Sequence, residues 1–120
     1  MPTPRQSLGQ RGETLAAQHL RHHGYTIVDR NWRCPTGELD IIAHDGKEWV
    51  FVEVRARRAP DTEAAVESIT SHKQARIVAA VEAYLLTHDL GEVAWRIDVV
   101  LVAFTPRGPQ IEVIHNAAGW

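Results

Sequence analysis

Acidic and basic side chains recur at a regular spacing in the first half of the chain. Glu38 and Asp40 lie two residues apart, and further along Glu53 and Arg55 repeat that spacing. Since successive side chains of a β-strand point to opposite faces, residues two apart share a face. Three carboxylates on one face repel one another unless a positive charge lies among them. The spacing therefore predicts a divalent cation, bound by carboxylate oxygens, next to a basic side chain.

A tight turn between the two segments would bring these side chains together. Asp45 and Gly46 both tolerate the positive φ of a two-residue hairpin turn, and apolar runs flank them at 39–43 and 49–54. With this loop, the strands pair Ile42 with Trp49, Asp40 with Phe51 and Glu38 with Glu53. We therefore expect an antiparallel hairpin that carries the acids and Arg55 on one face, at its open end.

A simpler interpretation is a solvated face on which Arg55 or Arg57 pairs with the acids. However, the acids lie beside the most apolar runs of the chain, where a solvated face would alternate more regularly. Their order, a carboxylate followed at a distance by Glu-x-basic, favours the metal site. This order resembles that of metal-dependent nucleases of the PD-(D/E)xK superfamily.

The resemblance extends over nearly the whole chain. The segment 37–40, the strand 50–54 and Arg57 are similar to the central signature of the YraN family, small bacterial proteins related to archaeal Holliday-junction resolvases. Further matches are Gly12, Glu13 and Ala16, the run Asn31-Trp32-Arg33, Lys73-Gln74, and Arg96 with Asp98 and Val99. The resemblance implies a restriction-endonuclease-like core, nuclease activity on DNA, branched or junction DNA included, and a homodimer, because the strands of a junction need two sites.

The resemblance and the chemistry of phosphodiester hydrolysis together suggest roles for the acids. Mg²⁺ or Mn²⁺ held by carboxylates activates water and stabilises charge on the phosphate, and Mg²⁺ keeps several waters, so few protein ligands suffice. Asp40 and Glu53 are the expected ligands, with the carbonyl oxygen of Val54 as a third. Glu38 is expected to be an outer ligand or an orienting residue. Glu13 would act through a water or a second metal.

Glu13 belongs to a helix expected at 7–23, which Gly24 ends. It lies three residues before Ala16 and seven before Leu20, on the stripe that faces the core. A carboxylate there is costly unless it is paired or near water. Glu13 is therefore either an acid of the metal site, as the resemblance also implies, or an early-turn acid that favours the helix dipole.

The residue two positions after Glu53 leaves two hypotheses open, because the usual family pattern has Lys where this chain has Arg55. A guanidinium keeps the charge and the affinity for phosphate, but cannot readily release a proton. In an active enzyme, Arg55 would stabilise the phosphate. Lys73, in the first turn of the second helix, would either reach into the site as well or be a solvated lysine. Alternatively, the site is degenerate and the protein is a non-catalytic DNA-binding module. A structural protein with a relict acidic pocket is a third alternative.

The remaining elements follow from periodicity and turn residues. We expect a strand at 25–32, a helix at 71–86, a strand buried on both faces at 93–104 and an edge strand at 111–114, with a mobile loop at 59–70. The order is helix, three strands, helix, two strands. This order predicts an α/β fold with a mixed central sheet of about five strands and flanking helices.

Composition limits the class of protein. A chain of 120 residues fits one domain, 1–120, and its single cysteine, Cys34, cannot form an internal disulfide. A cytoplasmic location is therefore expected, without a membrane span or signal peptide. The net charge of -2 gives no evidence for nucleic-acid binding, but the cations are mostly Arg, which suits phosphate contacts. The expected DNA contacts are Arg11, Arg33, Arg57, Arg58 and Arg76.

Overall fold

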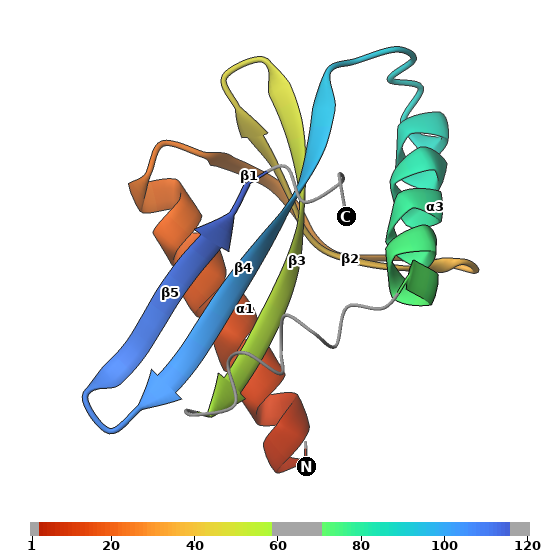
Figure 1. Cartoon of the computed structure of the whole chain (residues 1–120). Helices are drawn as coiled ribbons and strands as arrows, with labels where there is room; N and C mark the ends of the chain where they lie inside the picture. The colour runs from red at the N-terminus through yellow and green to blue at the C-terminus, as the bar shows by residue number, and fades with distance from the viewer. Residues whose placement is uncertain (1–2, 59–70, 116–120) are drawn as a thin grey trace.

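The computed structural model describes residues 3–58 and 71–115 (Figure 1). Its elements are, in chain order, α1 (Pro4–His22), β1 (Thr26–Cys34), β2 (Gly37–Asp45), β3 (Glu48–Arg58), α3 (Ser71–Thr87), β4 (Trp95–Thr105) and β5 (Gly108–Ile114). The predicted order of elements is confirmed. The loop expected at 59–70 lies outside the described residues. Neither helix of the described ranges combines the length and apolar character needed to cross a bilayer.

The five strands form one mixed sheet in the order β1-β2-β3-β4-β5. β3 and β4 run parallel, and the other neighbouring strands are antiparallel. A parallel pair needs a crossover connection, and α3 lies within that connection. Figure 1 shows α1 and α3 on opposite faces of this open sheet. The mixed α/β architecture expected from the sequence is therefore confirmed.

Each face of the sheet has its own hydrophobic core. On the face covered by α1, Ala16, Ala17 and Leu20 are buried with side chains of the central strands. On the other face, Ile77, Val81 and Tyr84 of α3 pack on a second set that includes Phe51 and Ile97. The helical and strand periodicities that the sequence shows are those of these two buried faces.

The ends of both helices carry residues with positive φ. Gly24 follows α1 with φ +90°, and the amide of Tyr25 donates to the carbonyl of Leu20 at 2.9 Å. After α3, Asp89 takes φ +51°, and the amide of Leu90 donates to the carbonyl of Leu85 at 3.0 Å. These bonds occupy carbonyls that a helix end otherwise leaves without partners.

The hairpin loop differs from its prediction by one residue. Asp45 pairs with Glu48, so the loop is Gly46-Lys47 rather than Asp45-Gly46. Gly46 has φ +64° at the first loop position, as in a type II′ turn. The predicted partners are therefore wrong: Ile42 faces Phe51, His44 faces Trp49, and Glu38 pairs with Arg33 of β1. Because each partner moves by two residues, residues 41–45 keep the faces that the predicted register gave them, whereas Glu38 and Asp40 lie outside the β2–β3 pairs.

The two strands of the hairpin separate near Asp40. In the described part of the sheet, the β2–β3 pairs run from Asp45–Glu48 to Ile41–Val52 and go no further. Leu39 belongs to the core under α3, whereas Ile41 belongs to the core under α1. Regular alternation would put these two residues on one face, so β2 is irregular at Asp40. This irregularity opens a gap between β2 and β3.

Candidate metal centre

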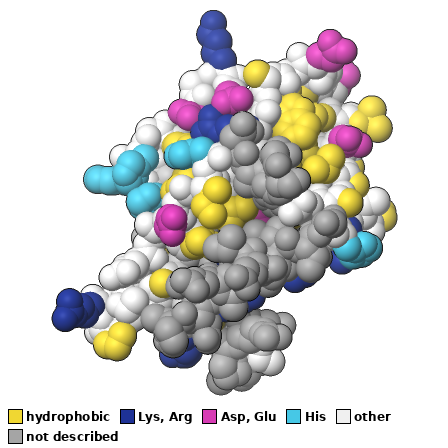
Figure 2. Space-filling view, in the orientation of Figure 1, with side chains coloured by type: hydrophobic (Ala, Val, Ile, Leu, Met, Phe, Trp, Pro, Cys, Tyr) yellow, Lys and Arg dark blue, Asp and Glu magenta, His cyan; other side chains and the backbone are white. Residues whose placement is uncertain are grey.

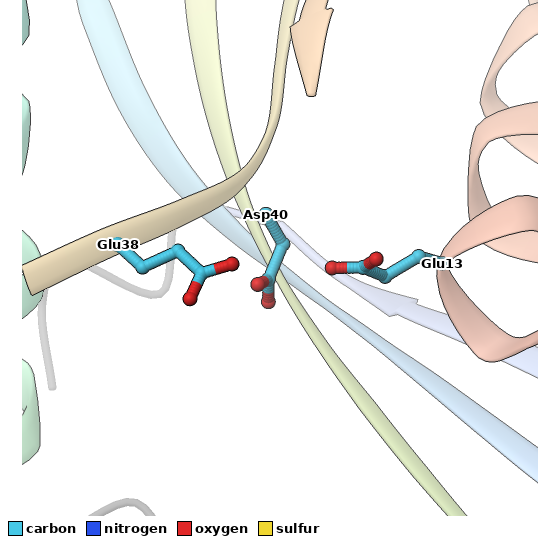
Figure 3. Close-up of side chains that lie close together, drawn as sticks. All are labelled: Glu13, Glu38 and Asp40. Atoms are coloured by element: carbon cyan, nitrogen blue, oxygen red, sulfur yellow. The ribbon is translucent and has the colours of Figure 1, made fainter. Parts of the chain in front are cut away.

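Three carboxylates meet at the gap between β2 and β3. Glu38 and Asp40 come from β2, and Glu13 comes from α1 (Figure 3). Each offers one oxygen, and these oxygens all lie within 4.8 Å of one another. Figure 3 shows Glu13 and Glu38 directed toward Asp40 from opposite sides. A set of oxygen donors at this spacing is chemically suited to Mg²⁺ or Mn²⁺.

Close packing of α1 on β3 brings Glu13 to the gap. A Cβ atom added at Gly12 would lie 2.6 Å from the Cβ of Ala56, which is closer than real Cβ atoms approach one another. Gly12 therefore lets the helix backbone rest directly on the strand. The next residue, Glu13, then extends past the strand toward Asp40.

Asp40 is held by the backbone of β3. The amide of Val54 donates to Asp40 Oδ2 at 2.8 Å, so the carboxylate takes the place of a strand partner where the ladder has ended. In an extended strand, the amide and carbonyl of one residue point to the same side. The carbonyl of Val54, predicted as a ligand, thus faces the same gap as Asp40.

Glu53 and Arg55 form an ion pair beside the three acids. Arg55 Nη2 lies 3.1 Å from Glu53 Oε1, and the two side chains are 16% and 14% exposed. Burial, followed by the charge of Asp40, raises the pKa of Glu53 to about 8, although Arg55 opposes the rise. Arg55 Nε is buried and has no hydrogen-bond partner among the described residues. The charge of Arg55 is therefore not enough to keep the pKa of Glu53 in its usual range.

The surroundings of Glu13 likewise contain more negative than positive charge. Burial raises the pKa of Glu13 to about 7, and the charge of Asp40 adds to the effect while Arg30 opposes it. Neighbouring carboxylates with raised pKa values either hold protons or accept a cation that displaces them. The residues present therefore fit a divalent ion.

Asn31 of β1 also contacts this group. Its side-chain nitrogen lies 2.9 and 3.1 Å from the two carboxylate oxygens of Glu13, with the amide turned so that it can donate. Asn31 has φ +54°, although it lies within a strand. The residue patterns of the sequence predicted no separate role for Asn31. The signal that could have found it is an asparagine, poorly suited to strands, inside a strand pattern.

An open hollow of about 630 Å³ lies over the acids. Its lining includes Glu13, Asn31, Glu38, Asp40, Glu53 and Arg55. A second hollow shares Glu38, Glu53 and Arg55 with it and continues to Lys73 and Arg76 of α3. A third shares Val54 and Arg55 and continues to Arg57 and Arg58. The three hollows share Arg55, and cationic side chains line the two that adjoin the acidic one; together we call them the groove.

Two predicted DNA contacts lie differently from the others. Arg33 Nε is 3.6 Å from Glu38 Oε2, and its side chain, at the edge of the groove, is 78% exposed. Arg11 faces another part of α1, where its guanidinium lies 4.7 Å from the ring centre of Phe104. Of the residues predicted for the site, Arg11 is therefore the one that lines none of these three hollows.

The fold and the site define an α/β protein that has a carboxylate centre at a gap in a mixed sheet. A model of the family described as "Uncharacterised protein family UPF0102" matches residues 12–102. The chain belongs to this family, so the resemblance to the YraN family is confirmed. Glu13, Asn31, Asp40, Glu53 and Arg55 all lie within the matched range.

Relatives match over most of their length. A UPF0102 protein of Roseiflexus castenholzii is 48% identical over 113 residues, covering 92% of this chain and 90% of the relative. A UPF0102 protein of Chloroflexus aurantiacus is 50% identical over 112 residues, covering 92% and 89%. One of Dehalococcoides mccartyi is 41% identical over 115 residues, covering 96% and 95%.

Proposed function

We propose that this protein is a metal-dependent endonuclease that hydrolyses phosphodiester bonds of DNA. The observation that carries the proposal is the oxygen cluster of Glu13, Glu38 and Asp40 within 4.8 Å, beside the Glu53–Arg55 pair. The groove supports internal cleavage rather than cleavage at an end, because cation-lined hollows adjoin the acidic hollow both toward α3 and toward the end of β3. A strand lying in it would place a phosphate over the carboxylates and its neighbours near cations.

The residues of the site would have different roles in hydrolysis. Asp40, Glu13 and Glu38 would hold Mg²⁺ or Mn²⁺, with Glu53 as a further ligand, and the bound metal supplies an activated water and charge stabilisation. The amide of Val54 keeps Asp40 oriented. Arg55, at the junction of the hollows, would stabilise the charge that develops on the phosphate, with Lys73 and Arg76 holding the strand.

A non-catalytic DNA-binding module is the second candidate, and one observation favours it. Arg55 is already paired with Glu53, and a guanidinium stays protonated at neutral pH, so it cannot act as a general base. Such a site would bind metal and DNA without cutting. A protein of this kind would shield or present DNA through the same groove.

A metal-titrated cleavage assay tests the first proposal. The substrates are branched, flapped and single-stranded DNA and matched RNA strands, with Mg²⁺ and Mn²⁺ each varied. Cleavage by the wild type and none by Asp40→Asn supports the nuclease. DNA binding without cleavage at any metal concentration supports the module instead.

Two further parts of the proposal have their own tests. Resolution of a junction needs two sites, so we propose a homodimer, which sedimentation with and without junction DNA would check. We also place the activity in a reducing cytoplasm, because Cys34 has no second cysteine with which to form an internal disulfide. Fractionation of cells would test that location.

A further inference from the structure

Asn31 has a backbone conformation that its surroundings in a strand do not explain. Its φ is +54°, and a residue with a Cβ atom seldom adopts positive φ, although Asn does so more readily than most. Its neighbours Arg30 and Trp32 keep regular partners in β2, Ile41 and Leu39. Within the described strand β1, the positive φ is thus confined to one residue, and it lies opposite Asp40, where β2 is irregular. Local strain of this kind concentrates at functional sites.

The unusual conformation directs the Asn31 side chain to Glu13. With the amide turned so that its nitrogen faces Glu13, this nitrogen lies 2.9 and 3.1 Å from the two carboxylate oxygens, on the β1 side. The same carboxylate faces Asp40 on its other side (Figure 3). Asn31 and Glu13 line the same hollow. A long, flexible side chain on the surface of a helix is thereby held at both oxygens, in the direction of the other acids.

We propose that Asn31 is a positioning residue that fixes the carboxylate of Glu13 for binding a divalent cation together with Glu38 and Asp40. This inference rests on the metal site of the proposed function, but it does not require cleavage. Groups that hydrogen-bond a metal ligand orient it, and their loss weakens metal affinity by about 10- to 100-fold. The amide is suited to this role because it donates without adding charge.

Titration of the protein with Mn²⁺ alone, in the absence of DNA, tests the role. Asn31→Ala is expected to weaken Mn²⁺ binding by about 10- to 100-fold. Asn31→Gly should show the same loss, because Gly accepts positive φ easily but has no amide side chain. If Asn31→Gly keeps wild-type affinity while Asn31→Ala loses it, the backbone conformation matters rather than the amide, and the inference is overturned.

Asp89 provides the matched control. It has φ +51° at the end of α3 and lines none of the hollows of the groove. Asp89→Ala places the same strain in the fold, so it should lower the melting temperature and leave Mn²⁺ affinity unchanged. Equal affinities of wild type and Asn31→Ala would overturn the inference, as would a wild type that binds no Mn²⁺.

The nuclease proposal fails in a different way from this inference. In one outcome, the wild type binds Mn²⁺, Asn31→Ala weakens this binding, and the wild type cuts no nucleic acid. That outcome contradicts the nuclease and supports the positioning role. A wild type that cuts, with Asn31→Ala binding Mn²⁺ equally well, supports the nuclease and contradicts the positioning role.

Discussion

Arg55 pairs with Glu53 beside the clustered acids, and its environment limits what it can do. One end of its guanidinium pairs with Glu53, while its Nε is buried without a partner among the described residues. It also borders all three hollows of the groove. A charge held in this way needs little reorganisation when negative charge develops on a phosphate beside it. Arg55 is therefore suited to electrostatic stabilisation and unsuited to proton transfer.

Substitution of Arg55 separates these roles. If Arg55 acts only through its charge, Arg55→Lys should leave the rate equal or higher, because an ammonium keeps the positive charge beside Glu53. Arg55→Ala should lower the rate by about 10²- to 10³-fold, as removal of one transition-state interaction does. Single-turnover cleavage of one branched DNA measures both variants.

Lys73→Ala is the comparison for Arg55, because Lys73 lines the same hollow. A larger loss for Lys73→Ala than for Arg55→Ala would mean that the helix residue has taken over the catalytic role. Cleavage that appears only in Arg55→Lys would identify the natural site as degenerate.

The raised pKa of Glu53 makes stability depend on pH. Burial and Asp40 raise this pKa from 4.5 to about 8, so between these values the folded protein keeps a proton that the unfolded chain has lost. The stabilisation is complete below pH 4.5 and is lost as the pH rises toward about 8. Without metal, the melting temperature should therefore fall over this range. Thermal unfolding in a series of buffers measures the fall.

Glu53→Gln is the control for the pH dependence, since its amide has no proton to lose. In this variant, we expect the melting temperature to depend less on pH. The remaining decrease should end near pH 7, where Glu13 titrates. Saturating Mg²⁺ should cancel much of the wild-type slope, because the ion replaces the protons. A wild-type melting temperature that rises from pH 5 to pH 8 would contradict the pKa shifts.

At the scale of the elements, the helices, strands and turns that periodicity and turn residues determine could be predicted from the sequence. The stripe of Ile77, Val81 and Tyr84 predicted α3, and these residues are buried in it. Continuous apolar character predicted a strand buried on both faces, which is β4. The hairpin was also predicted, but its loop was placed one residue too early, because Asp-Gly and Gly-Lys both allow a two-residue turn and differ only in which position takes positive φ.

The details that form the site were harder to predict because they break the periodic pattern. Asp40 belongs to the centre because β2 is irregular there, and no alternation of apolar residues encodes an irregularity. The role of Asn31 depends on a positive φ within a strand. Glu13 was predicted from its helical stripe, but its contact with Asp40 requires the close approach of α1 that Gly12 allows.

The approach of α1 to β3 can be tested at Gly12. Gly12→Ala gains up to about 1 kcal/mol of helix propensity, but its methyl group would overlap Ala56, and overpacking costs about 1–3 kcal/mol. The overlap should dominate, because both Cβ atoms are fixed to their backbones. The free energy of unfolding should fall, and Mg²⁺ should raise the melting temperature less than in the wild type, since Glu13 is displaced.

Two variants show whether space between the helix and the strand is the cause. Gly12→Ala combined with Ala56→Gly restores the room and should recover part of the stability and of the metal response. Gly9→Ala is the propensity control, because a Cβ at Gly9 meets nothing within 4 Å, and it should stabilise the protein slightly. If Gly12→Ala is as stable as Gly9→Ala, the helix and strand are not in close contact.

On the scale of the whole molecule, the chain carries no excess of positive charge. The chain has 13 Lys and Arg residues against 15 Asp and Glu. On the face drawn in Figure 2, the visible Lys and Arg side chains lie mainly near the margins, separated by neutral and acidic groups. Contacts with phosphate are therefore expected to be few and local, along the groove rather than across the whole protein. Binding of DNA should then depend on salt with a shallow slope.

The salt dependence of DNA binding tests where the phosphates lie. Arg57 and Arg58 line the hollow on one side of the acids. The double variant Arg57→Ala with Arg58→Ala should therefore weaken DNA binding for every sequence. It should also reduce the slope of log K against log salt by about 1 for each phosphate that is no longer neutralised. The control, Arg21→Ala with Lys47→Ala, removes the same charge from exposed positions outside the groove, at the end of α1 and in the hairpin loop. Because a general charge effect would change both double variants alike, only a local interaction separates them. Fluorescence anisotropy with one labelled single strand at several salt concentrations gives the slopes. Equal slopes in the two variants would place the DNA outside this groove, and the acidic centre would then need another substrate.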